Sequence, residues 1–237
     1  MNSRRPKSSA LPEGTKRTPG RPREFDREVV LDRAMRLFWS RGYESTSVSD
    51  LTEAMGVTAP TLYSAFGDKK GLFLESVERY LTGPAAFVLN ALTQEPTAER
   101  AMERLMRESV DFFTAADHPK GCMVVLAASN CSDASADVAH ILAERRRAGE
   151  RMIRERISAG LNAGELPHGT DVDALAGTII STVYGLSIQA RDGASRASLM
   201  KTVTQVMKAW PGRTSASSKR HRATTRRRVR SGLSDVG

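Results

Sequence analysis

Hydroxyl-bearing side chains gather between residues 47 and 66 of this 237-residue chain, in the stretch SVSDLTEAMGVTAPTLYSAF. Tyr63 carries a hydroxyl that can donate to a phosphate oxygen, and Thr61 offers a hydroxyl and a methyl group that suit the edge of a thymine. Such contacts require side chains that project from one rigid element. Local structure therefore decides whether this chemistry is available.

The first half of the stretch is predicted to form a short helix. Ser47, followed three residues later by Asp50, is a capping-box-like start. Gly56 can adopt the left-handed backbone with which a helix often ends, because it has no Cβ atom. Between these ends, apolar residues fall on one helical face: Val48, Leu51 and Met55.

A second helix is predicted after the turn at Gly56. Thr58 can cap it, and Pro60 lies in its first turn, where a missing N–H does little harm. Leu62 is expected to face the core, which leaves another surface to Thr58, Ala59, Thr61, Tyr63 and Ser64. Helix, turn and helix form the arrangement that places one helix in the DNA major groove. Two amphipathic helices joined by a glycine are also common as plain structure, so these residues alone leave both interpretations open.

Residues 25 to 81 resemble the N-terminal domain of the tetracycline-repressor (TetR) family of transcription regulators, most specifically in the run GVTAPTLYSAFGDKK at 56–70. The resemblance implies an all-α fold, with an N-terminal three-helix helix-turn-helix DNA-binding domain and a C-terminal helical ligand-binding and dimerisation domain. Four parts of the chain are expected: a disordered basic arm over 1–24, the DNA-binding domain over 25–67, the ligand and dimer domain over 68–210, and a disordered basic tail over 211–237.

The resemblance also implies which side chains meet DNA. Thr61 and the positions around Ala59 and Ala65 would meet base edges, while Tyr63 and Lys69 would meet phosphates. Because Ala59 and Ala65 are small, direct hydrogen-bond readout is not expected at these two positions.

Two further segments are expected to add DNA contacts. Ser47 and Ser49 start the first of the two helices, whose positive end attracts phosphate. Arg21, in the segment PGRPR at 19–23, can enter a minor groove, where the negative potential attracts arginine; a solvated tail is the alternative. The residues predicted to contact DNA are Arg21, Ser47, Ser49, Thr58, Ala59, Pro60, Thr61, Tyr63, Ser64 and Lys69.

The net charge of +9 is concentrated at the two ends of the chain. Residues 1–23 hold seven basic residues and one acidic residue, and residues 211–237 hold eight and one, which gives +6 and +7 and leaves −4 between them. Basic tails are attracted to polyanions through counterion release and add affinity with little sequence information. A sequence-tolerant, architectural nucleic-acid binder that uses the tails is therefore a second hypothesis.

Beyond Pro96 the pattern stays helical as far as Trp210. By resemblance, a pocket for a small-molecule effector is expected, with lining residues that are equally plausible as core: Met106, Phe113, Met123 and Tyr184. The resemblance further implies a homodimer, in which the last two helices, near 171–191 and 195–210, pair across a two-fold axis. The residues expected at this interface, which are otherwise intramolecular core, are Leu175, Ile179, Thr182, Leu186, Leu199, Val203 and Val206.

Cys122 is the basis of another hypothesis. It follows Gly121 at a predicted helix start, where the helix dipole lowers the pKa of a thiol and favours the thiolate. Some TetR-like regulators sense electrophiles or oxidants through a cysteine in a similar Lys-Gly-Cys segment, which suggests a redox or electrophile sensor. The alternative is a small buried apolar residue.

Enzyme and membrane functions find no support in the sequence. It contains no P-loop, GxGxxG, HExxH or GxSxG motif, and its four histidines lack metal-ligand spacing, so no catalysis, metal or cofactor is expected. No apolar run approaches the roughly 18 to 20 residues that cross a bilayer, the N-terminus lacks a signal peptide's apolar segment, and two cysteines fit a reducing compartment. We expect a cytoplasmic repressor that a small molecule releases from a palindromic double-stranded DNA operator.

Overall fold

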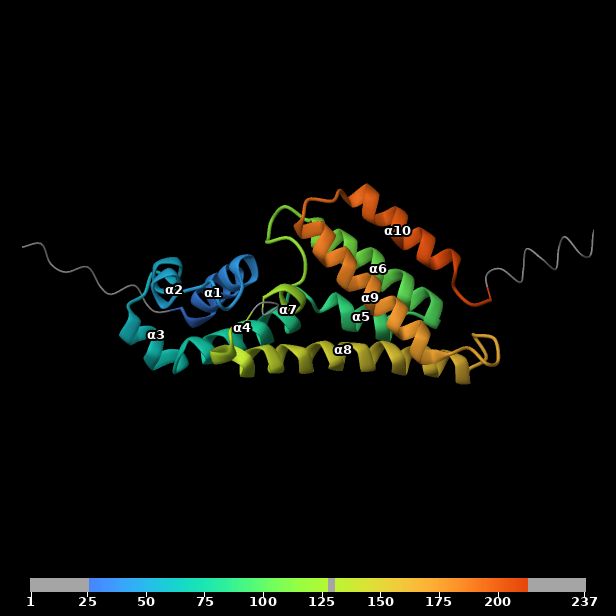
Figure 1. Cartoon of the computed structure of the whole chain (residues 1–237), viewed down its shortest axis with the longest axis horizontal. Coiled ribbons are helices and arrows are strands. Elements are labelled where there is room, and N and C mark those ends of the chain that lie inside the picture. Colours follow the sequence, from blue (N-terminus) through green and yellow to red (C-terminus); the bar gives the residue numbers. More distant parts are fainter. Residues whose placement is uncertain (1–25, 128–130, 213–237) are drawn as a thin grey trace, which may run out of the picture.

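The computed structural model describes residues 26–127 and 131–212, and in these residues every regular element is a helix (Figure 1). Arg21 and both predicted basic tails lie outside the described residues, apart from Pro211 and Gly212. The elements are α1 Arg27–Arg41, α2 Val48–Met55, α3 Ala59–Phe66, α4 Lys69–Thr82, α5 Phe87–Gln94, α6 Ala98–Thr114, α7 Met123–Leu126, the short 3₁₀ helix η1 Asp133–Ser135, α8 Ala136–Asn162, α9 Val172–Arg191 and α10 Arg196–Lys208.

These helices form an elongated body with two distinct ends. In Figure 1, α1, α2 and α3 lie at one end, while α6, α9 and α10 pack together at the other. The 27-residue helix α8 runs beneath both, and its length of about 40 Å lets one element contact both ends.

The predicted helix starts and stops are confirmed at the N-terminal end. Ser47 Oγ accepts the N–H of Asp50 at 3.0 Å, while the Asp50 carboxylate accepts the N–H of Ser47 at 2.8 Å, which completes the capping box. Gly56 ends α2 with φ of 70°, a left-handed conformation that favours glycine. Thr58 caps α3, and Leu62 is fully buried, as expected.

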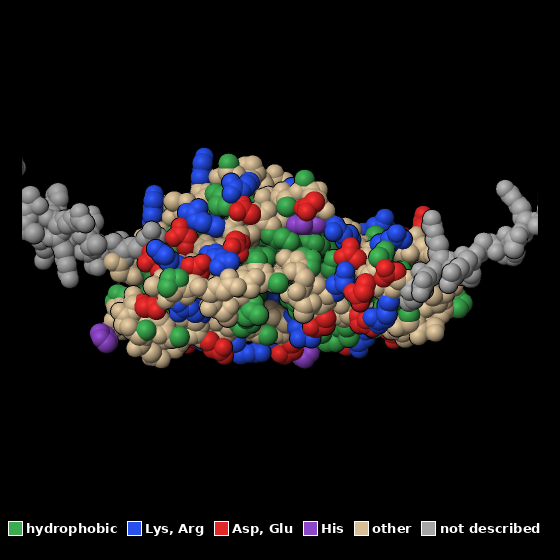
Figure 2. All heavy atoms as spheres, turned by 180° about the vertical axis from the view of Figure 1, so that it is seen from behind, with side chains coloured by type: hydrophobic (Ala, Val, Ile, Leu, Met, Phe, Trp, Pro, Cys, Tyr) green, Lys and Arg blue, Asp and Glu red, His purple; other side chains and the backbone are tan. Residues whose placement is uncertain are grey.

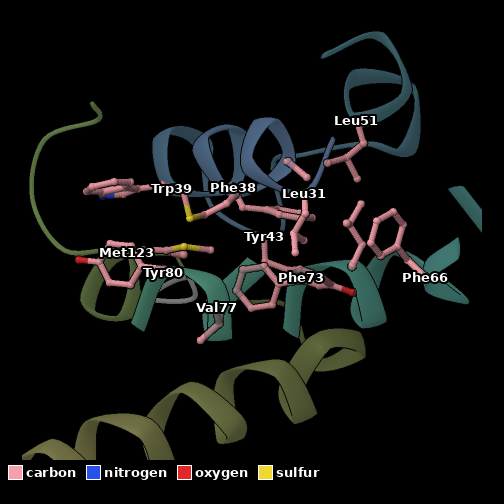
Figure 3. Packing of buried hydrophobic residues seen from close by; sticks show 14 of the residues in the cluster. Leu31, Phe38, Trp39, Tyr43, Leu51, Phe66, Phe73, Val77, Tyr80 and Met123 are labelled. Carbon is pink, nitrogen blue, oxygen red and sulfur yellow. The ribbon is translucent and has the colours of Figure 1, made fainter. Parts of the chain in front are cut away.

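A first hydrophobic cluster fills the end of the molecule that α1, α2 and α3 form. The rings of Phe38 and Phe73 meet edge to face at 5.0 Å between centroids, and those of Trp39 and Tyr80 do so at 4.9 Å, so α1 and α4 interlock (Figure 3). The cluster also takes in residues of α7 and α8, namely Met123, Val124, Val138 and Leu142. Buried contacts therefore cross position 67/68, and the domain boundary there stays a prediction.

A second cluster joins α5, α6, α9, α10 and the latter half of α8, and it includes four of the residues predicted at the dimer interface. Ile179, Leu186, Leu199 and Val203 are at most 1% exposed within this cluster. These four side chains pack inside their own protomer, which is the alternative that the sequence left open, and their contact with a partner stays a prediction. The other three predicted interface residues keep partial exposure: Leu175, Thr182 and Val206.

Three of the predicted pocket residues are buried in the hydrophobic clusters, and the fourth is partly exposed. Met106 and Phe113 are buried in the second cluster, Met123 is buried in the first, and Tyr184 is partly exposed. Packing accounts for the three buried side chains, and ligand contact stays a prediction for all four residues. Among the described residues, no helix is both long and apolar enough to cross a membrane.

Candidate nucleic-acid interface

Helix α3 has one buried side and one open side. Leu62 and Phe66 anchor it to the first cluster, while the Tyr63 side chain is 48% exposed. Thr58, Pro60 and Ser64 are exposed as well, and Ala59 and Thr61 are partly exposed. The six residues predicted for this helix and its cap therefore share a solvent-accessible surface with a tyrosine hydroxyl and several smaller donors.

The hydroxyl of Thr61 is oriented by the helix cap. The Oγ1 atoms of Thr58 and Thr61 lie 2.9 Å apart, and Thr58 Oγ1 also accepts the Thr61 N–H at 3.4 Å. Because the two hydroxyls share a hydrogen bond, the Thr61 side chain is held in one orientation before any base edge approaches it. In this orientation Thr61 can offer its methyl group and a remaining lone pair of its hydroxyl oxygen to a base edge.

Two arginines on α1 hold the helix-turn-helix in place, and the role of neither was predicted from the sequence. The Arg27 guanidinium lies 4.6 Å from the centroid of the Phe66 ring and donates to both carboxylate oxygens of Glu75, at 2.8 and 2.6 Å. Arg33 Nη1 donates at 3.2 Å to the carbonyl of Met55, the last residue of α2. A planar guanidinium can stack on a ring and pair with a carboxylate at once, which fixes the end of α3 against α1 and α4.

The close approach of α3 and α4 depends on Gly71, whose role was not predicted from the sequence. A Cβ added to Gly71 would lie only 2.2 Å from the carbonyl oxygen of Phe66. Glycine in the first turn of α4 therefore lets the turn at residues 67–68 bring the two helices together. Its signal in the sequence is its place three residues after Asp68, the residue whose side chain caps α4.

The start of α2 offers a serine hydroxyl that already has a partner. Ser47 Oγ lies 2.5 Å from the Asp50 carboxylate, and Arg41 Nη1 donates to Asp50 at 3.0 Å. The hydrogen bonds from Ser47 are the main reason why the pKa of Asp50 is lowered. Ser49 is exposed at this helix start. A phosphate here would meet the N–H groups of α2 and Arg41, with Asp50 as a competing anion.

Lys69, the predicted phosphate contact, is held against an aromatic ring. Its Nζ lies 4.3 Å from the centroid of the Tyr43 ring. Partial burial lowers the pKa of Lys69, against the opposing effects of Glu44, Cys131 and Asp50. On the face of the molecule in Figure 2, basic and acidic side chains are mixed, so this face offers no broad positive area to a polyanion.

Cys122 is at the start of α7, as predicted, but its pKa moves in the opposite direction. Burial raises the pKa of the Cys122 thiol, and this outweighs the lowering by hydrogen bonds from Tyr80 and from the N–H groups of Val125 and Val124. This direction fits the alternative of a small buried residue, because a four-residue helix supplies only a small dipole; a sensing role for Cys122 stays a prediction. Within the described ranges, no group of three or more potential ligands could hold a metal ion.

Comparisons with known proteins agree with this geometry. A family model described as "Bacterial regulatory proteins, tetR family" matches residues 30–76, and "Tetracyclin repressor-like, C-terminal domain" matches residues 98–206. The transcriptional repressor ComR of Escherichia coli (strain K12) is 38% identical over 197 residues, which cover 83% of this chain and 94% of ComR. The repressor BdcR of the same organism is 27% identical over 186 residues, 78% of this chain and 89% of BdcR.

A solved structure with a matching fold contains DNA. It is a cysteine mutant of the TetR family transcriptional regulator CifR in complex with a 26-base-pair double-strand operator DNA. CifR is 41% identical to this chain, with a TM-score of 0.78 over 81% of this chain and 100% of the CifR chain. The match of both family models, the identity to ComR over nearly its whole length and the helix-turn-helix of α2 and α3 lead to one conclusion: this chain belongs to the TetR family of bacterial transcription regulators.

Proposed function

We propose that this protein is a homodimeric repressor that binds a palindromic operator through α3 and is released by a small-molecule effector. The observation that carries the proposal is the open side of α3, where an exposed Tyr63 stands beside the paired hydroxyls of Thr58 and Thr61. Tyr63 would bind a phosphate and Thr61 a base edge. The name of ComR as a repressor and the operator complex of CifR support this choice.

A second copy of the chain would bind the other half of the palindromic operator. A surface groove of about 660 Å³ runs along α9 and is lined by small and polar residues, namely Ala174, Gly177, Thr178, Ser181, Thr182, Gly185, Gln189 and Thr202. Small side chains let a neighbouring helix approach closely, and the exposed Ile188 of the same helix adds apolar area. Thr182 is thus the predicted interface residue whose position best fits this proposal. Two recognition helices about 34 Å apart would then read successive major grooves.

The effector would act through the contacts between the two ends. Phe112 and Cys122 each pack against both hydrophobic clusters, and Trp39 of α1 donates to the carbonyl of Gly121 at 3.0 Å. A ligand that favours one arrangement of α6 and α7 would therefore change the position of α1 and, with it, operator affinity. The proposal assigns the protein no catalysis and places it in the cytoplasm, where its operator lies.

Cysteine sensing is the competing account of the signal, and nothing in the geometry favours it. A sensor thiol reacts as the thiolate, whereas burial raises the pKa of Cys122. Alkylation of Cys122 in the folded protein, followed by mass spectrometry, should leave operator affinity unchanged. A loss of affinity that tracks modification and is absent in Cys122→Ser would establish the sensor instead.

The test of the proposed function is binding to the DNA upstream of its own coding region, in excess nonspecific competitor. Tyr63→Ala and Tyr63→Phe should each weaken binding about tenfold, because both lose a hydrogen bond from the hydroxyl to a charged phosphate. A chain that ends at Gly212 should keep its preference for the site. Binding that disappears with competitor or with the tail, and that ignores the Tyr63 substitutions, would contradict the proposal and favour an architectural binder.

A further inference from the structure

The first turns of α4 and α8 face each other at the DNA-reading end of the molecule. Lys70 of α4 forms an ion pair with Asp137 of α8, and Ser132, just before η1, donates to the Glu44 carboxylate at 2.6 Å. The neighbouring Lys69 lies over the Tyr43 ring. We call the contacts of Lys69, Lys70, Tyr43, Glu44 and Asp137 the α4 clamp.

The α4 clamp surrounds two lysines with acidic groups. Desolvation is the largest cause of the raised pKa of Tyr43, and the carboxylates of Asp137, Asp68 and Glu44 raise it further. Three acids therefore lie close to the ring on which Lys69 rests. The pKa of Asp137 is lowered, above all by its hydrogen bond from Lys70.

The position of Lys70 makes it a candidate for contact with DNA. It is the second residue of α4, and the only residues between Lys69 and the end of α3 are the turn residues Gly67 and Asp68. The α4 N-terminus therefore lies beside the C-terminal end of α3, the helix that the proposed function places against DNA. Both members of the pair keep contact with solvent, with side chains 38% and 54% exposed for Lys70 and Asp137. An exposed ion pair is held weakly enough for a phosphate to compete.

We propose that Lys70 is a further phosphate-binding residue, and that Asp137 withholds it in the DNA-free protein. Operator phosphates and the Asp137 carboxylate then compete for the same ammonium group. The inference rests on the proposed function, since it deepens the account of how that surface is regulated. It also gives α8 a direct role. A shift of the first turn of α8 that strengthens the ion pair with Lys70 weakens DNA binding. A shift that separates the pair strengthens DNA binding.

Buried contacts join α8 to both hydrophobic clusters, so a shift of α8 would reach the ion pair between Lys70 and Asp137. The backbone N–H of Tyr43 donates to the carbonyl of Ala127 at 2.7 Å, and Val138 and Leu142 of α8 are buried in the first cluster. The same helix reaches the second cluster through Ile153 and Ile157. Rearrangement around the far half of α8 would therefore be transmitted along one continuous helix to Asp137.

The test compares Asp137→Asn with the wild type on operator and on a random duplex of equal length. Asp137→Asn should bind both about two- to fivefold more tightly, in keeping with the strength of an exposed ion pair. In a Lys70→Ala background the same substitution should have no effect. The slope of log affinity against log salt should be steeper for Asp137→Asn than for the double variant by about 0.9, which corresponds to one phosphate contact.

Glu78→Gln is the matched control. Glu78 pairs with Arg145, so it too joins α4 to α8, but it lies eight residues further along α4, a distance of about 12 Å. That exceeds the Debye length of about 8 Å at physiological salt, so loss of this acid should change affinity less than twofold. Thermal midpoints of all variants would establish that they are folded.

Two results would overturn the inference. One is unchanged affinity of Asp137→Asn on both duplexes, and the other is a gain that persists without Lys70, which would indicate a general effect of charge. The proposed function fails separately: if wild type does not prefer operator to random duplex while the Lys70-dependent gain remains, the regulator proposal is wrong and the Lys70 proposal stands.

Discussion

The two ends of this molecule are specified in different ways. At the DNA-reading end, α2 and α3 have eight residues each, and every boundary is marked by a local signal: the Ser47 capping box, Gly56 with its positive φ, the Thr58 cap, and Gly67 with its positive φ. At the other end, α9 runs for 20 residues with apolar or small residues on most of its surface. There, packing against α6, α8 and α10 decides which side is buried.

This difference shows which structural features can be predicted from a short stretch of sequence and which cannot. A cap or a turn depends on a few neighbours in the chain, so its physical cause is contained in the sequence window that is being read. The buried side of an apolar helix depends on partners far away in the chain. Leu186 and Ile188, two residues apart on α9, are 0% and 42% exposed, although both are large aliphatic side chains.

The largest expected effect comes from Leu186→Ala. Because Leu186 is fully buried in the second cluster, we expect the free energy of unfolding to fall by about 2 to 5 kcal/mol. Chemical denaturation at fixed protein concentration measures it. Ile188→Ala is the control: it should change protomer stability by less than about 0.5 kcal/mol and instead weaken association, which sedimentation would detect. Equal destabilisation by both variants would remove the distinction between core and interface on α9.

Two glycine-to-alanine substitutions in helices should change stability by smaller amounts, one lowering it and the other raising it. Gly71→Ala at the DNA-reading end should cost about 1 to 3 kcal/mol, since its Cβ would lie 2.2 Å from the Phe66 carbonyl oxygen. Gly149→Ala in α8 meets nothing within 4 Å, and it should stabilise the protein by about 0.5 to 1 kcal/mol through helix propensity alone. Thermal unfolding of the two variants is the measurement. A stabilised Gly71→Ala would mean that α3 and α4 do not approach as closely as described.

The same contrast explains which parts of the site the sequence could predict. The caps, the turn and the exposed side of α3 all follow from local pattern, and the resemblance to TetR regulators added roles for Tyr63 and Lys69. The partners of these residues could not be predicted, because Arg27 reaches Glu75 and Lys70 reaches Asp137 across 48 and 67 residues of chain. The burial that raises the pKa of Cys122 could not be predicted for the same reason. A helix start is visible in the sequence, whereas the burial that outweighs it comes from the tertiary fold.

The smallest effect is a difference in acid stability between the two ends, and two tryptophans can report it. Trp39 is buried in the first cluster and Trp210 in the second, each 3% exposed. Three carboxyl groups at the DNA-reading end have lowered pKa values: Glu44 through Ser132, Asp50 through Ser47 and Asp137 through Lys70. A lowered pKa in the folded state stabilises the fold above the ordinary carboxyl pKa of about 4, and this stabilisation is lost as pH falls through the folded-state value. Fluorescence of Trp39, followed in Trp210→Phe, should therefore change at a higher pH than that of Trp210, followed in Trp39→Phe. Coincident transitions would instead mean that the clusters unfold as one cooperative unit, held together by Phe112 and Cys122 where the two clusters meet.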